Sequence, residues 1–165
     1  MALDATSAER PPPSRPGSVV GIVAARFHED LTGAMVDSAE RELIACGVEE
    51  DDVVVIWVPG SFELPIVARR MAASGEIDSV ICIGVVLRGE TDHDRWVTEG
   101  AVHGLIQASL ETDVPIHLGI LTCTTMEQAR ARALPPEAGG REDKGRAVAR
   151  AAIETLLALD EVEEL

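Results

Sequence analysis

SVICIGVVL, at residues 79–87, is apolar throughout after its first residue. A strand with one face in water alternates apolar and polar residues, whereas a strand covered on both faces of a parallel sheet does not. Three more runs of this kind occur, at residues 18–25 (SVVGIVAA), 53–58 (VVVIWV) and 115–121 (PIHLGIL). We therefore predict four strands that are buried on both faces of one sheet.

Helical patterns separate these strands. After the first run, Leu31, Met35, Ala39 and Leu43 recur every four residues, which places them on one face of a helix. Similar patterns follow each of the other runs. Strands that alternate with helices predict an α/β fold, here a three-layer sandwich with a four-stranded parallel sheet flanked by helices on both faces.

The length and composition fit one domain. The chain has 165 residues, of which 46% are apolar, enough for a substantial core. Residues 1–18 (MALDATSAERPPPSRPGS) are rich in Pro, Ser and charge, a composition typical of a flexible arm. We expect an N-terminal arm at residues 1–18 and a single domain at residues 19–165.

Charge and cysteine usage exclude several classes of function. The net charge of −15 opposes binding to nucleic acid or to anionic membranes. The three cysteines are too far apart in the sequence for a metal-site motif, and glycine-rich nucleotide loops are absent. We expect a cytoplasmic protein with reduced thiols and with no metal or other cofactor.

Ligands of parallel sheets gather outside the carboxyl ends of the strands. The candidate site loops are therefore residues 25–29, 59–63, 87–93 and 122–125. In the third loop, His93 stands where the next helix is expected to start, and a neutral imidazole there could move protons near pH 7. The alternative is a surface histidine in a polar loop.

Three further side chains in or near these loops have two interpretations each. Glu63 could accept hydrogen bonds from a ligand, or complement the dipole of the following helix. Phe27 could stack on a flat heterocycle, or cover the core. Arg132 could bind phosphate, or lie on a solvated helix face. Thr124-x-x-Glu127 is a capping-box pattern, which predicts the start of the helix that carries Arg132.

Several short strings follow one another in a characteristic order: Ala25-Arg26-Phe27, VPGSFELP (58–65), RGETDH (88–93), Leu121-Thr122 followed by Glu127-Gln128-Ala129, and Lys144-Gly145. Together they resemble the lumazine synthase family over about Val19 to Leu159. The resemblance implies a transferase of riboflavin biosynthesis. It would condense 5-amino-6-(D-ribitylamino)uracil with 3,4-dihydroxy-2-butanone 4-phosphate to 6,7-dimethyl-8-ribityllumazine, phosphate and water. It also implies a ring of five subunits with active sites between neighbours.

The resemblance further implies roles for individual residues. Phe27 would stack on the pyrimidine ring, and Leu118 would reach the site from a neighbouring subunit. Ser61, Phe62 and Glu63 would hold the ribityl chain and the ring edge. Val85, Val86 and Leu87 would offer backbone groups to the uracil. Gly89, Glu90 and Thr91 would receive the phosphate together with Arg132, and His93 would be the catalytic proton shuttle.

Some positions depart from the family pattern: His28 stands where Asn is usual and Leu118 where an aromatic residue is usual, and Arg95, Glu99 and Gly100 also differ. These departures leave two alternatives open. One is a diverged flavin- or lumazine-binding shell protein without useful turnover, and the other is a related pentameric riboflavin synthase.

The connection between the last two helices, residues 134–143 (LPPEAGGRED), is longer than the short turn of shell-forming relatives. It predicts a pentamer, or a pair of pentamers, rather than an icosahedral shell. The alternative is that the loop bulges into solvent and a shell still forms.

Overall fold

A parallel sheet of four strands, in the order β2-β1-β3-β4, forms the middle layer of the protein. The computed structural model describes residues 10–165, so the first nine residues of the predicted arm lie outside the described residues. Along the chain the strands and α-helices are β1 (Val20–Ala25), α1 (Glu29–Ala45), β2 (Val53–Val58), α2 (Leu64–Ala72), β3 (Ser79–Leu87), α3 (His93–Thr112), β4 (Ile116–Cys123), α4 (Met126–Ala133) and α5 (Lys144–Glu163). Short 3-10 helices lie at η2 (Glu50–Asp52), η3 (Ser61–Glu63) and η4 (Pro136–Ala138).

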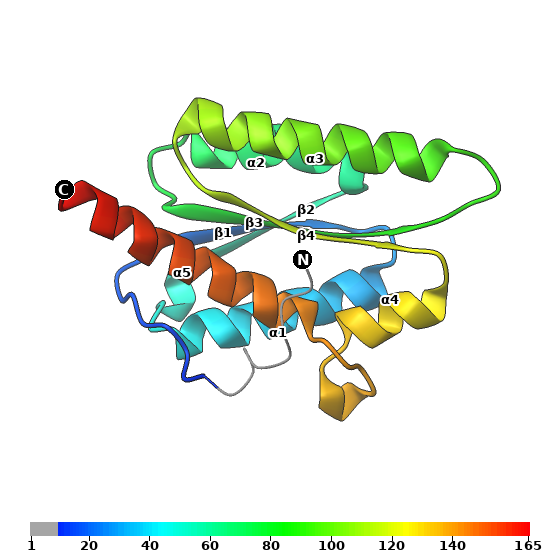
Figure 1. Ribbon diagram of the computed structural model, residues 1–165, viewed down its shortest axis with the longest axis horizontal. Helices are drawn as coiled ribbons and strands as arrows, with labels where there is room; N and C mark the ends of the chain where they lie inside the picture. The colour runs from blue at the N-terminus through cyan, green and yellow to red at the C-terminus, as the bar shows by residue number, and fades with distance from the viewer. Residues whose placement is uncertain (1–9) are drawn as a thin grey trace.

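Helices cover both faces of this sheet (Figure 1). On one face, α1, α4 and α5 pack against side chains such as Ile22 and Ile81. On the other face, α2 and α3 pack against Val23 and Cys82. Neighbouring residues of β1 and β3 thus enter opposite cores, which is why these strands are apolar at every position. The predicted three-layer sandwich is confirmed.

The predicted strands also agree closely with the structure. β2 and β3 have the predicted bounds, and β4 continues two residues beyond the predicted run, to Cys123. The predicted capping box is wrong by one residue. The N-cap of α4 is Thr125, whose hydroxyl accepts a hydrogen bond from the Gln128 backbone N–H at 3.2 Å. The side-chain oxygen of Gln128 accepts a hydrogen bond from the backbone N–H of Thr124 at 3.0 Å. Gln128 therefore has the capping role that the sequence predicted for Glu127.

The described part of the predicted arm lies against the domain. The Arg15 guanidinium donates two hydrogen bonds to the Asp160 carboxylate of α5, at 2.7 and 2.8 Å. The Arg15 backbone N–H donates to the Cys46 carbonyl just after α1, at 3.0 Å. Residues 15–18 therefore connect the amino end of β1 to the layer of α1 and α5.

The loops at the carboxyl ends of the strands are tied to one another in pairs. The backbone N–H of Arg26, after β1, donates to the Val58 carbonyl of β2 at 2.8 Å. The backbone N–H of Arg88, after β3, donates to the Cys123 carbonyl of β4 at 2.9 Å. All four candidate loops therefore meet at one end of the sheet. Among residues 10–165, every helix is too short or too polar to serve as a transmembrane span.

Candidate active site

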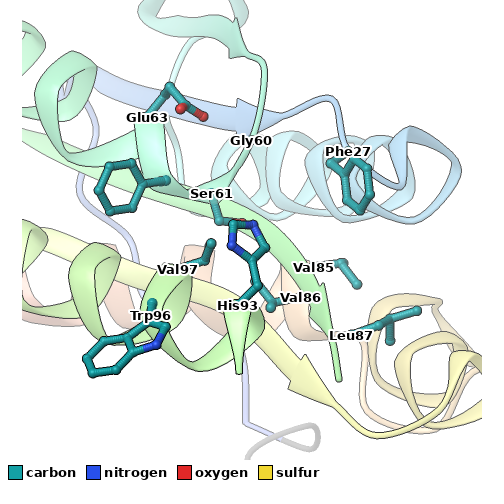
Figure 2. A pocket seen from close by; sticks show the side chains of 11 residues that line it. Phe27, Gly60, Ser61, Glu63, Val85, Val86, Leu87, His93, Trp96 and Val97 are labelled. Carbon is teal, nitrogen blue, oxygen red and sulfur yellow. The ribbon is translucent and has the colours of Figure 1, made fainter. Parts of the chain in front are cut away.

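A cavity of about 550 Å³ opens at this end of the sheet, between the loop after β1, the 3-10 helix η3, the end of β3 and the start of α3 (Figure 2). Its volume lies in the range usual for small-molecule sites. The lining residues are Phe27, Gly60, Ser61, Phe62, Glu63, Val85, Val86, Leu87, His93, Trp96 and Val97. Eight of these were predicted as site residues, so the structure brings the predicted pyrimidine wall and the predicted proton shuttle into one pocket.

His93 is the first residue of α3 and follows the N-cap Asp92. Figure 2 shows its imidazole projecting into the pocket from the start of the helix. The positive end of the helix dipole lies at this position. The loop that precedes it is held by a long hydrogen bond from the Gly89 backbone N–H to the Asp94 carboxylate, at 3.4 Å. The imidazole is exposed, so it is accessible to a ligand and to water.

Ser61 fits closely against β3 because position 84 is a glycine. A Cβ added to Gly84 would stand 2.4 Å from the Ser61 hydroxyl, far inside van der Waals contact. Ser61 is buried, although it lines the pocket. Gly84 therefore allows the whole of η3, with Phe62 and Glu63, to approach the strand.

Phe62 has a similar relation to α3. Its ring lies against Gly100, where an added Cβ would stand 2.8 Å from the ring carbon Cε2. Phe62 remains 60% exposed and forms part of the pocket wall. Gly100 thus leaves the space that the Phe62 ring occupies.

Phe27 stands at the opposite side of the pocket from Trp96 in Figure 2. It is 65% exposed, and its backbone N–H donates to the Pro59 carbonyl at 3.2 Å. The ring of His28 meets it edge-on, with centroids 4.6 Å apart and planes at 69°. This edge-to-face geometry is a favourable one for aromatic rings.

Five predicted residues do not line this cavity: Gly89, Glu90, Thr91, Leu118 and Arg132. The first three lie in the loop between Leu87 and His93, both of which do line it. Leu118 lies on the edge strand β4, is 48% exposed, and does not line this cavity.

Arg132 lies on α4, close to the end of β4. Burial raises the pKa of the neighbouring Cys123 thiol, and the Arg132 guanidinium opposes that shift. The guanidinium donates to the Gln128 carbonyl at 3.2 Å, and its Nε lies 3.7 Å from a Glu142 carboxylate oxygen. It is therefore partly exposed and weakly tethered on the side of α4.

Sequence reasoning missed three lining residues: Gly60, Trp96 and Val97. Trp96 could have been found, because it is one of only four aromatic residues and follows His93 by three positions, which places both on one side of a helix. Val97 continues the apolar stripe of α3, but it is half-buried and lines the pocket. Within residues 10–165, no group of three or more His, Cys, Asp and Glu side chains is arranged to hold a metal ion.

Comparison with known proteins agrees with these observations. The family model described as 6,7-dimethyl-8-ribityllumazine synthase matches residues 17–160. A protein of Salinibacter ruber named 6,7-dimethyl-8-ribityllumazine synthase is 44% identical over 151 residues, which cover 89% of this chain and 92% of that relative.

Proposed function

The chain belongs to the 6,7-dimethyl-8-ribityllumazine synthase family, and from this premise we propose how the pocket makes the lumazine and from which substrates. The enzyme, a transferase, forms 6,7-dimethyl-8-ribityllumazine in riboflavin biosynthesis. The proposed substrates are 5-amino-6-(D-ribitylamino)uracil and 3,4-dihydroxy-2-butanone 4-phosphate. Phosphate and water are released.

The chemistry needs few groups from the protein. The primary amine of the pyrimidine attacks the ketone of the four-carbon substrate and forms an imine with loss of water. Phosphate then leaves by elimination, and the second nitrogen closes the ring with loss of a further water. Each step moves protons, and a single imidazole can transfer them. Holding both substrates in one orientation accounts for much of the remaining acceleration.

The observation that carries this proposal is the joint placement of Phe27 and His93 on one cavity of suitable size. Phe27 offers a flat apolar face to the pyrimidine ring. The backbone of Val85, Val86 and Leu87 lies along the same wall and offers hydrogen bonds to the ring edge. Ser61, Phe62 and Glu63 approach from η3, where the Glu63 carboxylate can accept hydrogen bonds from the ribityl hydroxyls.

The phosphate would bind beside this cavity, at the loop of Gly89, Glu90 and Thr91. Backbone N–H groups at the start of α3 suit an anion. The hydrogen bond from Arg88 to Cys123 brings this loop to the end of β4, and Arg132 stands close to Cys123. A guanidinium and a helix start on neighbouring elements form a reasonable phosphate site.

We propose a ring of five subunits, or a pair of such rings, with active sites between neighbours. Exposed apolar side chains support an extensive contact surface: Val54 and Ile56 on β2, Phe62 and Ile66 near α2, and Trp96, Ile106 and Leu110 on α3. Leu118 lies on the edge strand β4 and does not line the cavity of its own chain, which supports a role in completing the pocket of a neighbouring subunit.

The native mass of the assembly tests this proposal. In the connection of residues 134–143, the backbone N–H groups of Arg141 and Glu142 both donate to the Ala131 carbonyl, at 2.7 and 3.2 Å. The loop is thereby folded onto α4 and adds bulk beside the start of α5. We expect particles of five or ten chains. A homogeneous particle near sixty chains would show that this loop does not prevent a shell.

The activity itself is tested by supplying both substrates and following lumazine fluorescence together with phosphate release. Equal amounts of the two products are expected. Binding of lumazine without turnover would support the shell-protein alternative, and formation of riboflavin from lumazine alone would support the riboflavin synthase alternative. We place the reaction in the cytoplasm because Cys46, Cys82 and Cys123 are free, buried thiols.

A further inference from the structure

His28 has an unfavourable backbone conformation. Its φ of 61° and ψ of 49° lie in the left-handed region, which is strained for residues other than glycine. It also occupies the N-cap position of α1, where Ser, Thr, Asp or Asn would accept a hydrogen bond from the helix start. The His28 side chain makes no such cap bond. Local stability therefore does not explain a histidine at this position.

The backbone hydrogen bonds of His28 do not depend on its side chain. Its carbonyl accepts hydrogen bonds from the N–H groups of Leu31 and Thr32, at 2.9 and 3.0 Å, which start α1. The Thr32 hydroxyl then donates to the Ala25 carbonyl at 2.7 Å and fixes the end of β1. The chain turns sharply between β1 and α1 as a result, and the turn orients the side chain at position 28.

The imidazole is what distinguishes histidine from Asn or Gly at this turn. It meets the Phe27 ring edge-on at 4.6 Å between centroids. Phe27 is 65% exposed, so water rather than core atoms surrounds much of its ring. An exposed ring with little packing samples several rotamers unless a neighbour restricts it.

We propose that His28 is a positioning residue that holds the Phe27 ring ready to stack on the pyrimidine substrate. The proposal rests on the proposed function, in which Phe27 is the aromatic wall. In the left-handed conformation that His28 adopts, its ring lies beside that of Phe27. Strain that is retained beside a binding site is consistent with such a role.

Three variants at this position test the proposal in the full-length enzyme. His28→Gly and His28→Asn suit the left-handed backbone and remove the ring. We expect both to raise the Tm by about 1–4 °C, since Gly and Asn adopt the left-handed conformation with less strain than histidine. They should raise the KM for the pyrimidine substrate about 2- to 10-fold, the range of one aromatic contact. The kcat and the KM for the phosphorylated substrate should stay within twofold of the parent.

His28→Phe restores an aromatic ring and should return the KM for the pyrimidine substrate to within twofold of the parent. Its Tm should be lower than those of His28→Gly and His28→Asn. Phe27→Ala is the reference variant and should raise the same KM at least as much as His28→Gly. An unchanged KM in His28→Gly beside a raised KM in Phe27→Ala would overturn the positioning role and leave the proposed function intact. If Phe27→Ala is also silent, Phe27 is not the wall and His28 has nothing to position. Lumazine affinity, measured by fluorescence, gives the same comparison independently of turnover.

Discussion

Replacing Gly100 with alanine should separate substrate binding from stability, because the glycine serves the pocket rather than the helix. Gly100 lies within α3, where alanine is the better helix former by about 1 kcal/mol. The added Cβ would stand 2.8 Å from Cε2 and 3.3 Å from Cδ2 of Phe62. Ordinary contact begins at about 3.4 Å, so the ring must retreat by roughly 0.6 Å. Phe62 is 60% exposed and can rotate without disturbing the core.

Gly100→Ala should therefore keep or raise the Tm and raise the KM for the pyrimidine substrate by several fold, since a displacement of this size disturbs a positioned contact. Steady-state kinetics with each substrate varied in turn, beside thermal unfolding of the same samples, provide both measurements. The KM for the phosphorylated substrate should not change.

Gly104→Ala is the matched control, one turn further along α3. Its Cβ would stand 2.8 Å from Cβ and 2.9 Å from Cγ of Pro65, a rigid ring in α2 that does not line the pocket. The two helices would have to separate, at a cost of about 1–3 kcal/mol that exceeds the gain in helix propensity. We expect a lower Tm and an unchanged pyrimidine KM. If Gly100→Ala and Gly104→Ala behave alike, the close fit of Phe62 on α3 has no part in binding.

Further changes address the other roles. His93→Ala should lower kcat by roughly 10- to 1000-fold with little change in KM, a range that overlaps the usual general acid–base contribution of about 100- to 10,000-fold, and an unchanged kcat at saturation would contradict its role. Arg132→Ala should raise the KM for the phosphorylated substrate far more than for the pyrimidine, whereas Arg130→Ala on the same helix should do neither. Burial lowers the pKa of His117 to about 4, from the ordinary 6.5. Between these values the unfolded chain binds the proton more readily, so the free energy of unfolding should fall by on the order of 2–3 kcal/mol as the pH drops from 7 to 4. Urea titrations should show a flatter pH dependence in His117→Gln and no flattening in His103→Gln, at an exposed control position.

The fold could be predicted because it depends on periodicity, which a sequence displays directly. The runs that became β2 and β3 were placed without error because both are apolar throughout. Burial on both faces explains this for β3, whereas the edge strand β2 exposes Val54 and Ile56, so the prediction that every strand is buried on both faces is wrong there. The capping box was misplaced because two threonines, Thr124 and Thr125, precede α4. Both offer a hydroxyl, and the choice depends on which backbone N–H groups come within reach. Such geometry is not visible in residue types alone.

The site was predictable where it depends on strand ends and less so where it depends on packing. Phe27 and His93 were singled out because loops after parallel strands converge at one end of a sheet, whereas Ser61 was implied by the family resemblance. Val97 continues the apolar stripe of Ala101 and Leu105 in the sequence, but it lines the pocket and does not join the core cluster that contains these two residues. The contribution of Gly100 could not be predicted, since it depends on a contact between segments far apart in the sequence.

The exposure of the aromatic residues connects the pocket with the assembly. The chain contains only four, and Phe27, Phe62 and Trp96 are each 60–65% exposed around one cavity. These exposed rings leave substantial apolar area in contact with water. Burying such area stabilises a complex by about 25 cal/mol per Å². Substrate covers some of that area only while it is bound. A neighbouring subunit that supplies Leu118 would cover more of it permanently, so closing the pocket and joining the subunits would bury the same surface. On this argument, variants that weaken the contact between subunits should also lose affinity for the pyrimidine substrate.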